Sequence, residues 1–195
     1  MRHRSRTVAL SILGAAAFAL AGCKDDSVEA EAFPDLQSCK AEASRSGLMS
    51  AAECDAAFAD AQALHVESAP RYDSLAVCEE QHGAGACGSE EQQVGNQQGS
   101  GSIFMPLLAG YLIGNMLGGR GGMAASQPLY RTPDGKFTNA TGSSTLSSNS
   151  GKGKMSSGLF ARPAATVGKP PMTRATAASR GGFGSSAGTR SSFGG

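Results

Sequence analysis

Apolar side chains gather in two continuous runs of the chain and, between the runs, at the spacing of one helix face. The first run extends from Thr7 to Ala19 and the second from Ile103 to Leu117. In between, apolar residues recur three and four positions apart, as they do along a helix: Cys54, Ala57, Phe58, Ala61 and Leu64. The other stretches are polar or low in complexity, so the pattern predicts short helices separated by long irregular segments.

Residues 1–22 have the features of a bacterial lipoprotein signal peptide. Basic residues precede Thr7, and the apolar run to Ala19 is too short to span a bilayer as a stable helix. The run leads into Leu-Ala-Gly-Cys23, the pattern of a lipobox, in which cleavage before the cysteine frees it for a diacylglyceryl group. Each buried methylene contributes about 0.8 kcal/mol to membrane binding, so two or three acyl chains anchor a protein firmly. We predict lipidation at Cys23; the alternative is an ordinary signal peptide with a chance cysteine.

The residues after Cys23 bear on the membrane in which such a lipoprotein would reside. In enteric-type sorting, an Asp directly after the lipidated cysteine retains the protein in the inner membrane. Lys24 stands at that position, although Asp25 and Asp26 follow it. We therefore expect a lipid-anchored protein of the cell membrane, with the outer membrane favoured and the body facing the periplasm. Residues 23–34 are predicted to be a tether.

An acidic segment, residues 35–90, contains the four remaining cysteines: Cys39, Cys54, Cys78 and Cys87. An even number of cysteines in an oxidising compartment indicates disulfides. Three pairings are possible, and nearness along the chain favours Cys39–Cys54 with Cys78–Cys87. A closed loop of about 15 residues would stabilise the fold by roughly 3 kcal/mol in the chain-entropy model.

Capping signals in the same segment predict two or three small helices. Asp35 can begin a helix that Gly47 ends. Ser50 and Glu53 have the spacing of a capping box for the next helix. Gly83 can end a further helix. We expect these helices to be held together by the two disulfides.

The ligand-type residues in this segment do not predict a metal site or an active site. Cys78, His82 and Cys87 lack a familiar zinc spacing, and disulfide formation is favoured over metal binding. His65 and His82 are expected to be exposed helix residues. A redox function would normally show a Cys-x-x-Cys motif, which the sequence lacks. No set of His, Ser and Asp stands on a convincing scaffold, so we expect no enzyme, no cofactor and no bound metal.

The second apolar run is predicted to be a helix over residues 103–118, after a polar linker over 91–102. Three glycines four residues apart, Gly110, Gly114 and Gly118, would form one smooth stripe on that helix. Leu107 and Tyr111 would supply larger side chains beside the stripe. The run is shorter than the ~20 residues of a membrane span. Three interpretations stay open: a helix in the bilayer interface, a helix packed in an oligomer or against a partner, and a core helix that covers the disulfide segment.

The C-terminal third is basic and of low complexity. Residues 119–137 contain the turn sequence Pro133-Asp-Gly135 and can form a small hairpin, and residues 138–195 are predicted to be a disordered tail. From Lys136 onward there are 8 basic and no acidic residues, whereas residues 23–100 hold 15 acidic and 4 basic ones. The two parts can attract each other or bind two kinds of partner. Because export makes nucleic acid an improbable partner, we expect an anionic envelope surface or no fixed partner for the tail.

Short motifs spread over most of the chain occur in the same order as in one known family: the lipobox at Cys23, the four later cysteines, Ser68 to Tyr72, Ser100 to Tyr111, Gln127 to Leu129, Asp134 to Lys136 with Thr138, and Arg180 to Gly184. By these motifs the chain resembles the YgiB-like proteins, uncharacterised Gly-rich bacterial lipoproteins with a domain of unknown function. The most specific match is the Met-Pro-Leu segment, which is similar to the family's SGSFWMPLMAGY. The resemblance implies a lipoprotein and gives no catalytic residue that can be transferred.

Together these patterns predict a mostly disordered chain with small α elements, namely disulfide-stapled short helices plus one apolar helix, and no large globular core. Low aromatic content, 6%, and the absence of Trp support that expectation, because little apolar area is available to offset backbone entropy. For function we expect an envelope lipoprotein with a structural or interaction role, bound to the membrane and to an envelope protein or anionic surface. The alternatives are a membrane-active homo-oligomer through Gly110, Gly114 and Gly118 and, more weakly, a redox or metal-binding accessory.

Overall fold

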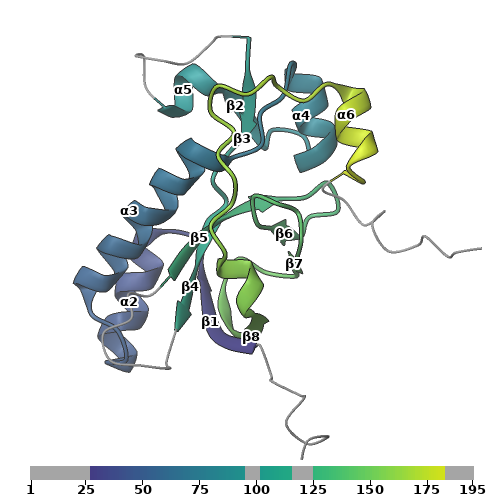
Figure 1. Cartoon of the computed structure of the whole chain (residues 1–195). Coiled ribbons are helices and arrows are strands. Elements are labelled where there is room, and N and C mark those ends of the chain that lie inside the picture. Colours follow the sequence, from purple (N-terminus) through teal and green to yellow (C-terminus); the bar gives the residue numbers. More distant parts are fainter. Residues whose placement is uncertain (1–26, 95–101, 116–124, 183–195) are drawn as a thin grey trace, which may run out of the picture.

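The computed structural model describes residues 27–94, 102–115 and 125–182. Its elements run in this order along the chain (Figure 1): β1 (Ser27–Phe33), α2 (Leu36–Ser46), α3 (Ala51–Ser68), α4 (Leu75–His82), β2 (Cys87–Ser89), α5 (Glu90–Val94), β3 (Phe104–Pro106), β4 (Gly110–Asn115), β5 (Ala125–Arg131), β6 (Phe137–Thr138), β7 (Thr145–Leu146), β8 (Gly151–Ser156), the 3-10 helix η1 (Ser157–Phe160) and α6 (Arg174–Ser179).

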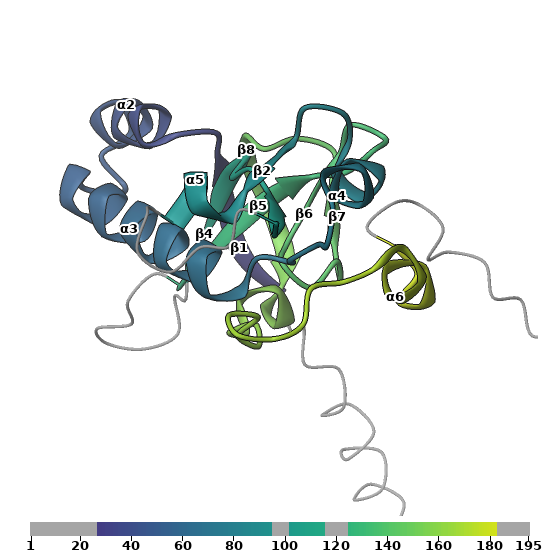
Figure 2. The same ribbon diagram turned by 90° about the horizontal axis from the view of Figure 1, so that it is seen from above.

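Six antiparallel strands form one curled sheet, a half-barrel, in the order β7-β6-β5-β4-β1-β8. Helices α2 and α3 cover one face of this sheet, as the view from above shows (Figure 2). A second, two-stranded sheet of β2 and β3 lies at the other end of the molecule, near α4. The prediction of a mostly disordered chain is therefore wrong, because strand pairing orders residues that carry no helical pattern.

Strand β1 is an inner strand of this sheet, next to the edge strand β8, although a tether over residues 23–34 was predicted. Its apolar residues Val28, Ala30 and Ala32 alternate with Glu29 and Glu31, which is the period of a strand with two different faces. The strand pairs with β4 on one side and with β8 on the other. Residues that follow shortly after the predicted lipobox are thus part of the sheet.

The predicted capping residues mark both ends of α2, the start of α3 and the end of α4, whereas the start of α4 is capped by Ser74. Asp35 caps α2, which ends at Gly47 in the left-handed conformation (φ 65°). Ser50 and Glu53 form a capping box on α3, and Gly83 ends α4. Helix α3 buries one face, on which lie Cys54, Ala57, Ala61 and Leu64.

Both disulfides that proximity favoured are present. Cys39 in α2 is bonded to Cys54 in α3, across 15 residues of chain. Cys78 in α4 is bonded to Cys87 in β2, across 9 residues. The first disulfide ties the helical pair together and the second ties α4 to the small sheet.

The apolar run does not form the predicted helix over 103–118 within its described part. Phe104–Pro106 is β3 and Gly110–Asn115 is β4, in the centre of the large sheet. Gly110 has a φ of 145°, and a Cβ there would lie 2.7 Å from the carbonyl oxygen of Phe33. A Cβ on Gly114 would lie 2.7 Å from the ring of Phe160. These glycines allow close packing within a sheet, not a stripe on a helix.

The C-terminal segment is folded through residue 182, so the prediction of a disordered tail over 138–195 is wrong for its described part. Phe137 and Leu146 pair across β6 and β7, after the predicted turn at Pro133 to Gly135, and β8 forms an edge of the sheet. Residues 161–173, here called the strap, then run to α6. Leu159 and Phe160 of η1 pack under the sheet with Leu112 and Leu129.

Cations of the basic C-terminal part bind carboxylates of the acidic N-terminal part. Lys152 of β8 lies 3.2 Å from Glu42 and 3.6 Å from Glu31. Arg162 of the strap binds Glu67 at 2.5 Å. Arg174 of α6 binds Glu80 of α4. The acidic and basic parts of the sequence therefore pair with each other inside the folded chain.

No helix in the described part of the chain is both long and apolar enough to cross a membrane.

Candidate functional site

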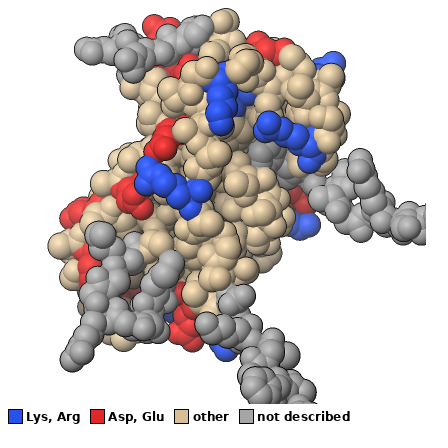
Figure 3. All heavy atoms as spheres, in the orientation of Figure 1, with Lys and Arg blue, Asp and Glu red and all other residues tan. Residues whose placement is uncertain are grey.

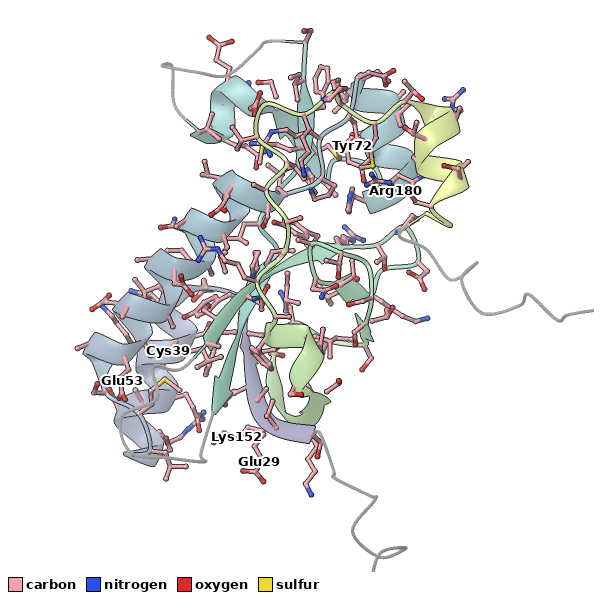
Figure 4. The ribbon with its side chains drawn as sticks, in the orientation of Figure 1. Glu29, Cys39, Glu53, Tyr72, Lys152 and Arg180 are labelled. Atoms are coloured by element: carbon pink, nitrogen blue, oxygen red, sulfur yellow. A yellow bond between two sulfur atoms is a disulfide. The ribbon has the colours of Figure 1, made fainter. Side chains whose placement is uncertain are left out.

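A groove of about 390 Å³ opens between α2 and the β1–β8 side of the sheet. Buried apolar side chains form its floor: Phe33, Cys39, Ala43 and Ile113. Glutamates and lysines form its rim: Glu29, Glu31, Glu42, Glu53, Lys152 and Lys154. Figure 4 shows Glu29, Cys39, Glu53 and Lys152 gathered at this end of the molecule. We call this feature the groove.

Strand register places four of the rim charges on one face of the sheet. Glu29 stands opposite Lys154, and Glu31 stands opposite Lys152, in the β1–β8 pair. Because side chains alternate along a strand, residues two apart lie on the same face. Phe33, two residues beyond Glu31, extends that face into the apolar core under α2. The groove thus lies where a strand face changes from charged to apolar.

The Cys39–Cys54 disulfide and Met49 shape the helical wall of the groove. Both disulfide cysteines are completely buried. The sulfur of Met49, in the loop between α2 and α3, lies 3.6 Å from each of the two Sγ atoms. Leu48, the residue before it, is 83% exposed at the lip of the groove. A rigid, disulfide-linked turn therefore presents one exposed leucine beside an apolar recess.

Ion pairs hold part of the rim and leave it with excess negative charge. Lys152 bridges Glu31 and Glu42, and Arg45 also binds Glu42. Burial raises the pKa of the Glu31 carboxyl, while the nearby Lys152 opposes that rise. The hydrogen bond to Glu42 in turn raises the pKa of Lys152. Four glutamates on the rim, against two lysines and the Arg45 that binds Glu42, leave a net charge of −1, which favours a cationic group beside an apolar one.

The remaining predicted contact residues do not form one site. Tyr111 is fully buried between Phe33 and Phe58, and its hydroxyl has no hydrogen-bond partner among the described residues. Burial raises the pKa of that hydroxyl to about 12. Leu107 lies in the segment between β3 and β4 and is 44% exposed. Cys23 and Gly118, the other two predicted positions, lie outside the described residues.

Both histidines of the acidic segment are buried, contrary to the prediction that they are exposed. The His82 ring bonds the Tyr72 hydroxyl at 2.9 Å and the Arg131 carbonyl oxygen at 2.8 Å. His65 lies 3.2 Å from the Tyr130 hydroxyl and 2.9 Å from Gln93 Oε1. Burial lowers the pKa of His82 to about 4 and lowers that of His65. These rings fill hydrogen-bonding positions that only the folded chain creates.

A buried ion pair completes this polar region. Arg71 donates through Nε to Glu90 at 2.6 Å, and its Nη2 donates to the carbonyl oxygen of Val66 at 2.7 Å. The Arg71 side chain is only 3% exposed.

Within residues 27–94, 102–115 and 125–182, no group of three His, Cys, Asp or Glu side chains is placed to hold a metal ion.

Sequence patterns identified the helical wall of the groove but not its strand wall. The cysteines and caps located α2 and α3. The alternation of Val28, Ala30 and Ala32 with two glutamates, and the Gly-Lys-Gly-Lys154 sequence, were the signals for β1 and β8. Those two signals lay in segments predicted to be a tether and a disordered tail, so the pairing was missed.

Comparison with known proteins places the chain in a family. The family model described as "Protein of unknown function (DUF1190)" matches residues 27–194. A UPF0441 protein of Klebsiella pneumoniae is 33% identical over 199 residues, which covers 95% of this chain and 82% of the relative. A UPF0441 protein of Yersinia pestis is 30% identical over 209 residues, 98% of this chain and 85% of the relative. No solved structure matches. The chain belongs to the DUF1190 family of proteins of unknown function, together with the UPF0441 proteins.

Proposed function

We propose that the chain is a non-enzymatic lipoprotein of the bacterial envelope, anchored through Cys23, whose groove holds a segment of a partner protein close to the membrane. The position of the groove beside the start of β1 carries the proposal. Ser27 opens β1 four residues after Cys23, and Glu29 on the rim follows two residues later. An extended chain spans at most about 3.5 Å per residue. An acyl anchor on Cys23 would thus keep the rim within about 20 Å of the bilayer.

Two other observations support export and anchoring. The described cysteines form two disulfides, which persist in oxidising compartments such as the periplasm. The basic start, short apolar run and small residues before Cys23 fit a lipoprotein signal, as does the resemblance to the YgiB-like lipoproteins. Lys24 after the cysteine favours the outer membrane.

The groove chemistry defines the kind of partner segment. Its floor accepts an apolar side chain, and Leu48 at the lip adds exposed apolar surface. The glutamate excess on the rim favours a Lys or Arg next to that apolar side chain. A segment with one large apolar residue beside a basic residue fits both features. An exposed apolar surface rimmed by charge is typical of protein contact sites.

Membrane fractionation tests the anchor. The wild type should sediment with membranes, and Cys23→Ser should be found in the soluble fraction or stay unprocessed in the inner membrane. Washing with high salt separates a lipid anchor from charge-mediated attachment, since surface electrostatics are screened by salt. If Cys23→Ser fractionates and is processed like the wild type, the anchor proposal is wrong.

In-cell photo-crosslinking tests the groove. A photoreactive amino acid at position 48 should give a discrete adduct with another protein. The matched position is 75, where Leu75 of α4 is 41% exposed but lies outside the groove. Equal adducts from both positions would argue against the groove. An adduct only with a second copy of the chain would replace the partner proposal with the homo-oligomer.

A further inference from the structure

A second cavity, of about 320 Å³, lies at the other end of the molecule, between the end of α3, the strap and α6. Its lining contains three basic residues, Arg71, Lys169 and Arg180, and no acidic residue. Figure 3 shows cationic groups on this face of the molecule, and Figure 4 places Arg180 at the end opposite Glu29 and Lys152. We call this feature the basic cavity.

Two of the three cations have no carboxylate partner among the described residues. The neighbouring strap and α6 cations are paired, Arg162 with Glu67 and Arg174 with Glu80. Lys169 forms no ion pair in the part of the chain that the structure describes, and the Arg180 guanidinium donates to the sulfur of Met172, at 3.6 Å, and to no carboxylate of the described residues. The strap and α6 therefore keep two unneutralised positive charges, and both line the same cavity.

Arg71, at the floor of the cavity, is held in place and its hydrogen-bond donors already have acceptors. Arg71 is held by Glu90, by Thr166 and by the carbonyl oxygens of Ala69 and Val66. Its own charge is thus balanced, and its guanidinium fixes the strap through Thr166. A ligand would be recognised by the two cations at the rim and would not need to break this network.

The walls are apolar and built from small or rigid side chains. Two of the wall prolines belong to the strap, and proline limits backbone freedom. The apolar lining comprises Pro70, Ala140, Pro163, Ala164, Pro170, Met172 and Ala177. Such walls suit methyl-sized groups, and Ser68, Thr141 and Thr166 add hydroxyl groups to the lining. The volume equals that of about ten water molecules at roughly 30 Å³ each, which is room for two or three small residues.

We propose that the basic cavity binds the carboxylate end of a peptide with small apolar side chains, the carboxylate lying between Lys169 and Arg180. Lys169 and Arg180 would supply charge-assisted hydrogen bonds to the carboxylate. The alanine and proline walls contact the methyl groups that precede it. This site is separate from the groove and does not depend on the lipid anchor.

The probe is N-acetyl-Ala-Ala-Ala with a free carboxylate, and its C-terminal amide is the matched control ligand. Binding to the purified full chain can be followed by calorimetry and by the NMR methyl signals of Ala140 and Ala177. The acid should bind at least tenfold more tightly than the amide and should lose affinity as salt is raised, because screening weakens exposed charge contacts. Equal binding of acid and amide would overturn the proposal.

A pair of double variants with the same change in net charge tests the residues. Lys169→Gln with Arg180→Gln should weaken binding of the acid at least tenfold. Lys136→Gln with Arg131→Gln removes two cations that lie outside both the groove and the basic cavity, and it should change affinity less than twofold. Unfolding temperatures confirm that both variants fold. Equal losses in both variants, tighter binding of inorganic phosphate than of the peptide, or binding confined to anionic vesicles would each contradict the assignment.

Discussion

The two ends of the molecule each contain one disulfide but bury different kinds of side chain. The end with the groove packs aliphatic and aromatic residues around Cys39–Cys54 and keeps its charges on the rim. The end with the basic cavity, near Cys78–Cys87, buries an ion pair and two histidine–tyrosine contacts. The first end therefore relies on apolar burial, whereas the second relies on complete hydrogen bonding.

The polar end is therefore more sensitive than the apolar end to the loss of a single hydrogen-bond or ion-pair partner. Truncating an apolar side chain in a core costs the transfer free energy of the removed atoms plus the free energy of the cavity that is left behind. A buried charge left without its partner costs more, since desolvation is then uncompensated. The buried polar groups also specify one arrangement of the strap, α4 and β5, because the donors of Arg71 and His82 have their acceptors in place only in that arrangement.

The largest expected effect comes from breaking the buried ion pair. Glu90→Gln removes the carboxylate that accepts from Arg71 Nε and should lower the free energy of unfolding by about 3–5 kcal/mol, because Arg71 is left charged and buried. Urea unfolding measures the change. The exposed pair Lys40–Asp55 provides the control: Asp55→Asn should cost less than about 1 kcal/mol. Similar losses in the two variants would refute the contrast.

Acid should destabilise the polar end through its buried histidines. The pKa of His82 is lowered from 6.5 to about 4 by burial, so the unfolded chain takes up a proton that the folded ring excludes. Stability is therefore full above pH 6.5 and falls by about 1.4 kcal/mol per pH unit as pH drops toward 4. His65, whose pKa is also lowered, acts in the same direction.

Denaturation curves between pH 7.5 and 4.5 measure that pH dependence. His82→Gln removes the titrating ring and should flatten the curve between pH 6.5 and 5, whatever its effect at pH 7.5. A slope unchanged from that of the wild type would show that His82 takes up its proton in the folded state.

At the groove end, the expected effect is steric. Gly114→Ala would place a Cβ 2.7 Å from the Phe160 ring and should cost about 1–3 kcal/mol through overpacking. Gly153→Ala, where nothing lies within 4 Å of a Cβ, is the matched substitution and should have almost no effect. Combining Gly114→Ala with Phe160→Leu should recover part of the loss. Thermal unfolding of the four proteins decides whether the contact exists.

The smallest expected effect concerns the strap. Arg162→Gln removes the exposed pair with Glu67 and should change stability by less than about 1 kcal/mol. The change should shrink further in high salt. A loss of several kcal/mol, measured by urea unfolding, would show that the strap depends on this pair more than on Thr166 and Arg71.

Local signals in the sequence determined helices α2, α3 and α4 and the two disulfides. Asp35, Gly47 and the Ser50–Glu53 capping box act within one turn of chain, and the paired cysteines are 15 and 9 residues apart. Because the interacting residues are close in the sequence, a short stretch of sequence is enough to predict these interactions. For that reason, one wall of the groove could be predicted without the structure.

The sheet, the strap and both cavities depend on contacts between residues that lie far apart in the sequence. Strand β1 joins residues 110–115 and 151–156, and the Lys152–Glu42 contact spans 110 positions. The glycine repeat at 110 and 114 suits a helix by its spacing, yet pairing with β1 makes it a strand. Hydrogen bonds between distant strands supply partners that no local window of sequence contains, so tertiary context outweighed the helical pattern.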